Sequence, residues 1–162
     1  MRVKYIETER YQDYKVPSMY IGCIQCNGKC CVEANIPITV CINDSLRKSK
    51  IFEIDDDKTI KKYLSNPITE AIVFGGLEPF EQFEEMFSFI KKLRNEYNCL
   101  DSVIIYTGYN EDEIAGYLDE LKQFKNIIVK FGRFVPDKPH VFDEILGVEL
   151  ASDNQYAKNI SK

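Results

Sequence analysis

The sequence lacks several features that mark whole classes of protein. It contains no uninterrupted apolar run of about 18 residues, the length that a membrane-spanning helix needs, so no contact with a membrane is expected. It also has no excess of basic residues, because its formal net charge is −5 at pH 7. Nucleic-acid-binding proteins need a basic surface, so no nucleic-acid partner is expected. Repeats and low-complexity linkers are absent, and 162 residues are predicted to form a single domain over 1–162.

The first residues, MRVKYIETERYQDYK, lack the apolar segment of a secretory signal, so a cytoplasmic protein is expected. Histidine is almost absent too, and the single His140 is interpreted as a loop residue without a role. Six cysteines are nevertheless present. Thiols stay reduced in the cytoplasm, where disulfides are rare. The cysteines therefore favour a metal site over disulfide bonds.

Short apolar segments alternate with amphipathic ones along the chain. The apolar segments predict strands at 17–22, 69–76, 102–109 and 126–134, and the amphipathic ones predict helices over 55–64, from Pro79 and from Asn110. This alternation predicts an α/β fold with a mainly parallel sheet and alternating helices. In such sheets, ligands bind beyond the carboxyl ends of the strands. The cysteine-rich segment, the sequence FGGLEPF and the sequence TGY all follow predicted strands, so we expect these three segments to meet.

Four cysteines lie within GCIQCNGKCC, at residues 22–31, and Cys41 follows ten residues later. We call residues 22–43 the cysteine loop. Thiolates favour zinc or an iron–sulfur cluster. Structural zinc usually takes two close cysteine pairs, but only Cys23 and Cys26 form such a pair. For an iron–sulfur cluster, Cys26 and Cys30 form C-x3-C and Cys41 supplies a third ligand, with Cys31 and Cys23 as competing ligands. Cys99 is interpreted as a small buried hydrophobic residue.

The segment FGGLEPF, at residues 74–80, places two glycines and a carboxylate between a predicted strand and a helix. We call it the glycine–acid loop. Gly75 and Gly76 allow the backbone to approach a ligand closely, and Glu78 can accept hydrogen bonds from an amino or hydroxyl group. By itself this pattern also fits an ordinary tight turn before a helix.

Together these segments resemble the radical S-adenosylmethionine (SAM) family, in which three cysteines hold a [4Fe-4S] cluster and a GGEP-type loop binds SAM. The sequences IIYTGYNEDEI, IVKFGRFVPD and ASDNQY are similar, in this order, to segments of anaerobic ribonucleoside-triphosphate reductase activating proteins. The chain departs from that pattern in several places. Glu33 stands where the third cysteine is usual, Leu77 is inserted in the GGEP-type loop, Lys130-Phe131 replaces Val-Asp, and Tyr156 replaces an arginine.

The resemblance implies a partial (β/α) barrel of the radical SAM type. It assigns the cluster to Cys26, Cys30 and Cys41, and SAM binding to Gly75, Gly76, Glu78, Thr107, Gly108 and Asn154. No side chain is assigned as a catalytic acid or base. The implied activity is reductive cleavage of SAM to a 5′-deoxyadenosyl radical, which abstracts hydrogen.

The implied substrate is a glycine of a glycyl radical enzyme, the anaerobic ribonucleotide reductase, and the implied electron donor is flavodoxin-like. Within the family, the alternative is modification of a small nucleoside or a peptide. Outside it, the alternatives are a structural zinc module and an electron carrier whose iron–sulfur cluster has four protein ligands.

Overall fold

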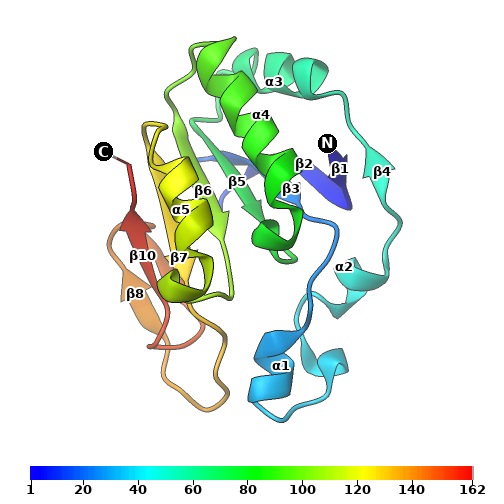
Figure 1. The fold of residues 1–162 in the computed structure, drawn as a ribbon, viewed down its shortest axis with the longest axis vertical. Coiled ribbons are helices and arrows are strands. Elements are labelled where there is room, and N and C mark those ends of the chain that lie inside the picture. The colour runs from blue at the N-terminus through cyan, green and yellow to red at the C-terminus, as the bar shows by residue number, and fades with distance from the viewer. Residues whose placement is uncertain (162) are drawn as a thin grey trace.

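A computed structural model describes residues 1–161. Its centre is a six-stranded sheet with the strand order β10-β7-β6-β5-β3-β2 (Figure 1). The strands of this sheet are β2 (Tyr5–Arg10), β3 (Ser18–Gly22), β5 (Ala71–Gly75), β6 (Ser102–Tyr106), β7 (Ile127–Phe131) and β10 (Tyr156–Asn159). Two small antiparallel pairs lie outside it, formed by β1 (Arg2–Val3) with β4 (Phe52–Glu53) and by β8 (Val141–Asp143) with β9 (Val148–Leu150).

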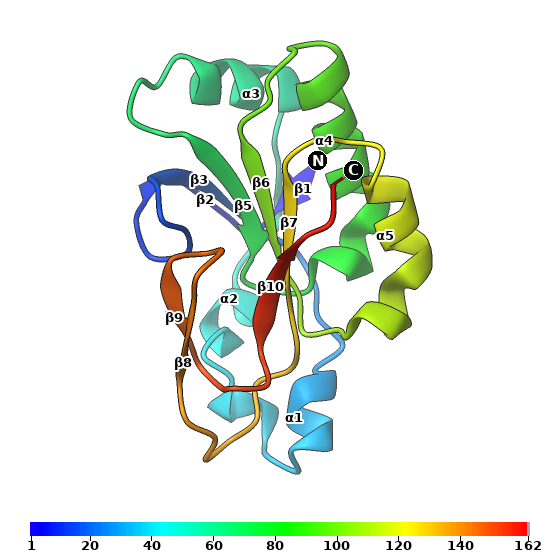
Figure 2. The same cartoon turned by 90° about the vertical axis from the view of Figure 1, so that its left-hand side faces the viewer.

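The helices divide into two groups. Three of them lie in the connections between the parallel strands: α3 (Asp56–Leu64) precedes β5, α4 (Phe83–Asn95) joins β5 to β6, and α5 (Ala115–Leu121) joins β6 to β7. Of the two short ones, α1 (Lys29–Glu33) lies within the cysteine loop and α2 (Asp44–Lys48) follows it. Both views show α1 beyond one end of the sheet (Figures 1 and 2). Within residues 1–161, no helix is both long and apolar enough to cross a membrane.

The predicted α/β class and the mainly parallel sheet are confirmed. Strands β3, β5, β6 and β7 run parallel to one another, while β2 and β10 pair antiparallel at the two edges. All four parallel strands are shorter than predicted. The strand predicted over 102–109, for example, ends at Tyr106, because Thr107 and Gly108 turn away to contact the neighbouring loop. As described over residues 1–161, the sheet stays open, since β2 and β10 each have one neighbour.

Apolar side chains cover both faces of the sheet. On one face, Ile72, Phe74 and Val103 pack with α3, α4 and α5 in the larger hydrophobic core. On the other face, Val73 and Ile104 pack with residues of the β8–β9 hairpin and of the segment before β3. Figure 2 shows this hairpin on the side of the sheet away from α4 and α5. Strands buried on both faces need nearly continuous apolar sequence, which explains AIVFG and SVIIY.

The helix starts follow their sequence signals. Asp55 caps α3 by accepting a hydrogen bond from the Lys58 amide at 3.0 Å. Asn110, where a helix was predicted to start, forms a capping box with Glu113 at the entry to the α5 segment. At Pro79 the structure differs from the prediction, because residues Pro79–Gln82 form a 3-10 turn before α4 begins at Phe83. Pro79 occupies the first turn as expected, since its missing N–H has no partner to lose there.

Phe89 offers a test of the larger core. Its ring is completely buried and packs edge-on against Phe74, with ring centroids 5.7 Å apart. Phe89→Ala is expected to lower the free energy of unfolding by about 3–5 kcal/mol, because it leaves a cavity in a close-packed interior. The matched control is Phe142→Ala, since the Phe142 ring is 56 % exposed, and its expected change is about 0.5 kcal/mol or less. Equal losses in both variants, measured by urea denaturation, would contradict this packing.

Candidate functional site: a thiol-lined cavity

One cavity of about 340 Å³ lies where the parallel strands end. Its wall combines side chains from the cysteine loop, the glycine–acid loop and the ends of β6 and β7. The lining residues are Arg10, Asp13, Tyr20, Cys26, Gly28, Cys30, Cys31, Ile38, Cys41, Ile42, Asn43, Arg47, Gly76, Leu77, Glu78, Tyr106, Thr107, Gly108, Lys130, Gly132, Phe134 and Gln155. The three segments that were expected to meet at the carboxyl ends of the strands therefore do so.

Four thiols share this cavity. Cys26 and Cys41 line it together with Cys30 and Cys31, whose sulfur atoms are 3.9 Å apart. Cys23, the other competing ligand, is elsewhere: its side chain is completely buried in the larger core. Cys99 is buried there too, which confirms the prediction that it is a small buried hydrophobic residue.

Two of the four thiols, Cys26 and Cys31, have a raised pKa. Burial raises the pKa of Cys26, and a hydrogen bond from the Gly28 amide to its sulfur, at 3.3 Å, offsets part of this effect. Burial and the neighbouring Cys30 raise the pKa of Cys31 to about 11. Because metals bind thiolates, loading this site must release protons.

The thiols do not converge on one point. Among residues 1–161, no three His, Cys, Asp or Glu side chains are close enough together to hold a single metal ion. A structural zinc ion needs four ligands at about 2.0–2.3 Å from one centre. A four-iron cluster instead takes each thiolate on a different iron, so its ligands stand further apart. Within residues 1–161, the thiols therefore form no ready-made site for a single ion.

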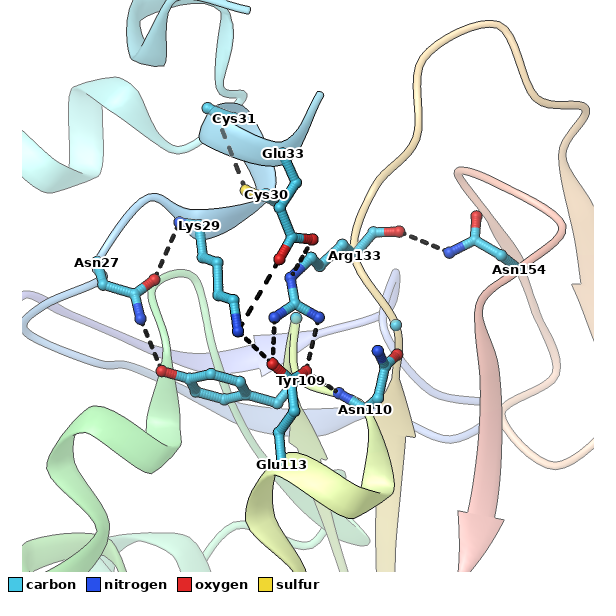
Figure 3. Close-up of polar contacts among 12 residues, drawn as sticks. Asn27, Lys29, Cys30, Cys31, Glu33, Tyr109, Asn110, Glu113, Arg133 and Asn154 are labelled. Carbon is cyan, nitrogen blue, oxygen red and sulfur yellow. Dashed lines mark hydrogen bonds and ion pairs between the residues drawn. The ribbon is translucent and has the colours of Figure 1, made fainter. Parts of the chain in front are cut away.

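Ion pairs hold the cysteine loop against the sheet (Figure 3). Glu113, at the entry to the α5 segment, accepts two hydrogen bonds from Arg133, both at 2.6 Å. The same guanidinium contacts Glu33 of α1 at 2.9 Å, and Lys29 of α1 also pairs with Glu113. These contacts lower the pKa of Glu113, chiefly through Arg133. Helix α1, which carries Cys30 and Cys31, is therefore attached to the segments that follow β6 and β7.

The glycine–acid loop contributes its backbone and one carboxylate. Gly76 has a φ of +79°, and a Cβ there would lie 2.5 Å from a methyl carbon of Leu46. Only glycine fits this close approach without strain. Glu78, which is 7 % exposed, accepts hydrogen bonds from the Thr107 hydroxyl at 2.7 Å and from the Gly108 amide at 2.9 Å. The Glu78 carboxylate thus connects the end of β5 to the end of β6.

The Glu78 carboxylate retains capacity for a ligand. Its third hydrogen bond comes from the Phe80 amide at 3.2 Å. A carboxylate has about four acceptor positions, so these three donors leave about one position open on a residue that lines the cavity. Burial raises the pKa of Glu78, and the three hydrogen bonds act in the opposite direction.

The predicted SAM residues do not all reach the cavity. Gly76, Glu78, Thr107 and Gly108 line it, whereas Gly75 and Asn154 do not. The Thr107 hydroxyl and the Gly108 amide both donate to Glu78. The Asn154 amide donates to the Arg133 carbonyl at 2.8 Å, and its buried Oδ1 has no hydrogen-bond partner among residues 1–161.

Eight polar side chains of the wall were not predicted from the sequence. Lys130, near the end of β7, is buried, as are Tyr20 and Gln155. The others are Arg10, Asp13, Asn43, Arg47 and Tyr106. Arg10 pairs with Asp13 at 2.5 Å and its guanidinium lies 4.3 Å from the centre of the Tyr20 ring. The only available signal was positional: Tyr20 lies near the end of a predicted strand, while Arg10 and Asp13 precede the first one.

The fold and the cavity describe an α/β protein that gathers thiols at the carboxyl ends of a parallel sheet, which is a suitable place for a redox metal centre. The sequence matches the 4Fe-4S single cluster domain family over residues 19–152, most of the chain. The chain therefore belongs to this family and is a 4Fe-4S cluster-binding domain. Comparisons with curated proteins and with solved structures found no match.

The hydrogen bonds of Glu78 can be tested by Glu78→Gln. An amide has one acceptor oxygen, so at least one buried donor from Thr107, Gly108 or Phe80 loses its acceptor. The free energy of unfolding is expected to fall by about 1–3 kcal/mol. The control is Glu84→Gln, because Glu84 is exposed, and it is expected to change stability by about 0.5 kcal/mol or less. Wild-type stability of Glu78→Gln in urea denaturation would argue against this network.

The predicted ligand set can be tested by metal content. After anaerobic reconstitution with iron and sulfide, the wild-type protein is expected to bind about four irons per chain. Cys26→Ala, Cys30→Ala and Cys41→Ala are each expected to lose most of this iron, since each removes one of three ligands. Cys99→Ala, outside the cavity, is the control and is expected to keep it.

The variant Cys31→Ala decides between the competing ligands that share the cavity. Retention of iron by Cys31→Ala supports the set of Cys26, Cys30 and Cys41. Loss of iron in Cys31→Ala with retention in Cys41→Ala would replace Cys41 by Cys31 in that set.

Proposed function

We propose that this protein is a radical SAM enzyme that generates the glycyl radical of an anaerobic ribonucleotide reductase. In this proposal Cys26, Cys30 and Cys41 hold three irons of the [4Fe-4S] cluster, and SAM binds beside the fourth iron. The open six-stranded sheet is then a partial (β/α) barrel of the radical SAM type. A flavodoxin-like protein supplies the electron.

The observation that carries the proposal is that one cavity contains both the thiols and the glycine–acid loop. Cys26, Cys30 and Cys41 face the same space as Gly76 and Glu78. A cofactor placed there contacts the cluster and the loop together. A purely structural metal site has no need of such an adjoining cavity, and an open coordination position is what separates reactive from structural metal sites.

The residues of the cavity have definite tasks in this proposal. The open acceptor position of Glu78 receives the amino group of SAM. Thr107 and Gly108 keep the Glu78 carboxylate in place by donating hydrogen bonds to it. The left-handed backbone at Gly76 lets the loop approach that group closely. Tyr20 and Tyr106 form part of the wall and help to exclude water from the reacting groups.

The chemistry itself belongs to the cofactors. One electron from the reduced cluster cleaves a carbon–sulfur bond of SAM to give methionine and a 5′-deoxyadenosyl radical, which takes a hydrogen atom from the substrate and becomes 5′-deoxyadenosine. No side chain of this chain has to transfer a proton in that step.

The size and rim of the cavity favour a protein as the substrate. About 340 Å³ is near the lower limit for a pocket that holds one small ligand. A cluster and a nucleoside cofactor leave little of this volume for a second small molecule. Ile42 and Phe134 line the cavity and are 93 % and 43 % exposed. Exposed apolar side chains at a cavity rim suit coverage by a partner protein, which supports this substrate over a free nucleoside.

One observation favours a second candidate, an electron carrier with a fully ligated cluster. Cys31 lines the same cavity, with its sulfur 3.9 Å from that of Cys30. If Cys31 occupies the fourth iron, no open position remains for SAM.

Cofactor cleavage distinguishes the two candidates. The reconstituted protein, reduced with dithionite, is expected to convert SAM to methionine and 5′-deoxyadenosine, detected by chromatography. Cys30→Ala is expected to lose this activity by at least about 100-fold, because it lacks a cluster ligand. Added SAM is also expected to change the electron paramagnetic resonance spectrum of the reduced cluster. An unchanged spectrum without cleavage identifies the electron carrier and ends the radical SAM proposal.

The substrate is tested separately with the anaerobic ribonucleotide reductase of the same organism. After incubation with SAM and the reduced protein, the reductase is expected to show the doublet signal of a glycyl radical. Cleavage of SAM without that signal would redirect the search to a nucleoside or a free peptide.

A further inference from the structure

Lys130 is a buried cation without a buried anion as its partner. It lies on β7, is 7 % exposed and lines the thiol-lined cavity. Its ammonium group donates one hydrogen bond, to the Gly132 carbonyl at 3.0 Å. Among residues 1–161, no carboxylate lies within ion-pair distance of it. An ammonium group has three N–H donors, so two remain without a partner in the protein.

A buried ammonium group with two unpaired N–H donors destabilises the folded protein unless a ligand pairs with it. A charge taken out of water is stabilised only when it is paired and hydrogen-bonded. Burial lowers the pKa of Lys130 to about 8, although the neighbouring Glu78 and Cys30 act to raise it. Glu78 acts on Lys130 only at longer range, since no ion pair joins the two side chains within residues 1–161. A close anion for Lys130 is therefore expected to come from a group bound in the cavity.

Glu78 and Lys130 present opposite charges to one cavity. Glu78 offers an open acceptor position, which suits an ammonium group. Lys130 offers free N–H donors, which suit a carboxylate. Together, the Glu78 acceptor and the Lys130 cation can bind the ammonium and carboxylate groups of an α-amino acid.

We propose that Lys130 binds the carboxylate of the amino-acid end of SAM, opposite the amino group that Glu78 receives. This inference rests on the proposed function. It assigns a ligand contact to a residue at which the chain departs from the activating proteins it resembles, since valine is usual at that position. Lys130 thereby selects cofactors that retain the carboxylate.

The test compares SAM with decarboxylated SAM, which keeps the amino group and the sulfonium but lacks the carboxylate. Dissociation constants are measured by anaerobic isothermal titration calorimetry on the reconstituted protein, without turnover. Wild-type protein is expected to bind SAM more tightly than the decarboxylated compound. In Lys130→Met, SAM binding is expected to weaken about 10- to 100-fold, the usual effect of losing a hydrogen bond between charged groups. Binding of decarboxylated SAM is expected to change by less than about 3-fold.

Two further variants guard against indirect effects. Lys130→Arg keeps the positive charge and is expected to restore part of the preference for SAM. Lys91→Met removes an exposed lysine of α4 and is expected to match the wild-type protein with both compounds. Iron content and circular dichroism are measured for every variant. If Lys130→Met does not fold, Lys130→Gln takes its place in the comparison.

Several results would overturn the inference. Unchanged SAM binding in Lys130→Met would exclude the contact. An equal loss for SAM and decarboxylated SAM, together with a more negative reduction potential of the cluster, would assign Lys130 to balancing the charge of the cluster. Both results leave the proposed function standing if the wild-type protein cleaves SAM. Failure of the wild-type protein to bind SAM would remove the proposed function and this inference together.

Discussion

The ion pairs of Arg133 attach the cysteine-bearing helix α1 to the rest of the site. Helix α1 has five residues, of which only Cys31 is buried, and a helix this short has little stability of its own. Arg133 connects Glu33 in that helix to Glu113, which is fixed by the capping box with Asn110. The Arg133–Glu113 pair has low exposure, 9 % and 20 %, and such charge-assisted pairs are among the stronger polar contacts in proteins, whereas Glu33 is 49 % exposed. The positions of Cys30 and Cys31 relative to the sheet therefore depend on a contact that lies outside the cysteine motif.

A second set of polar contacts, made by Glu78, positions the glycine–acid loop at the cavity. Glu78 joins the ends of β5 and β6 through Thr107 and Gly108. The cavity thus contains two buried charges, Glu78 and Lys130, beside four thiols. Charges in a partly dry cavity act more strongly than they do in water. The proposed binding of a small zwitterionic cofactor requires such an environment.

The parallel core of the sheet could be predicted because burial on both faces demands continuous apolar sequence. Segments such as AIVFG and SVIIY have no other satisfactory place in a folded protein. The edge strands β2 and β10 and the β8–β9 hairpin were not predicted. Their residues are largely exposed or alternate in exposure, so their sequences carry charged residues that do not distinguish a strand from a loop. Their pairing is decided by the apolar surface that the core strands leave uncovered.

Part of the candidate site could likewise be predicted from the sequence, and part could not. Local sequence identified the thiols, the glycines and Glu78, because each belongs to a short motif whose chemistry is evident from residue type and spacing. It also placed these motifs after strands, and hence at one end of the sheet. Only the tertiary structure showed that Cys23 points into the core, that Asn154 supports the backbone of Arg133, and that Lys130 enters the cavity. These facts depend on which direction a side chain takes when distant segments pack together, and no local pattern contains that information.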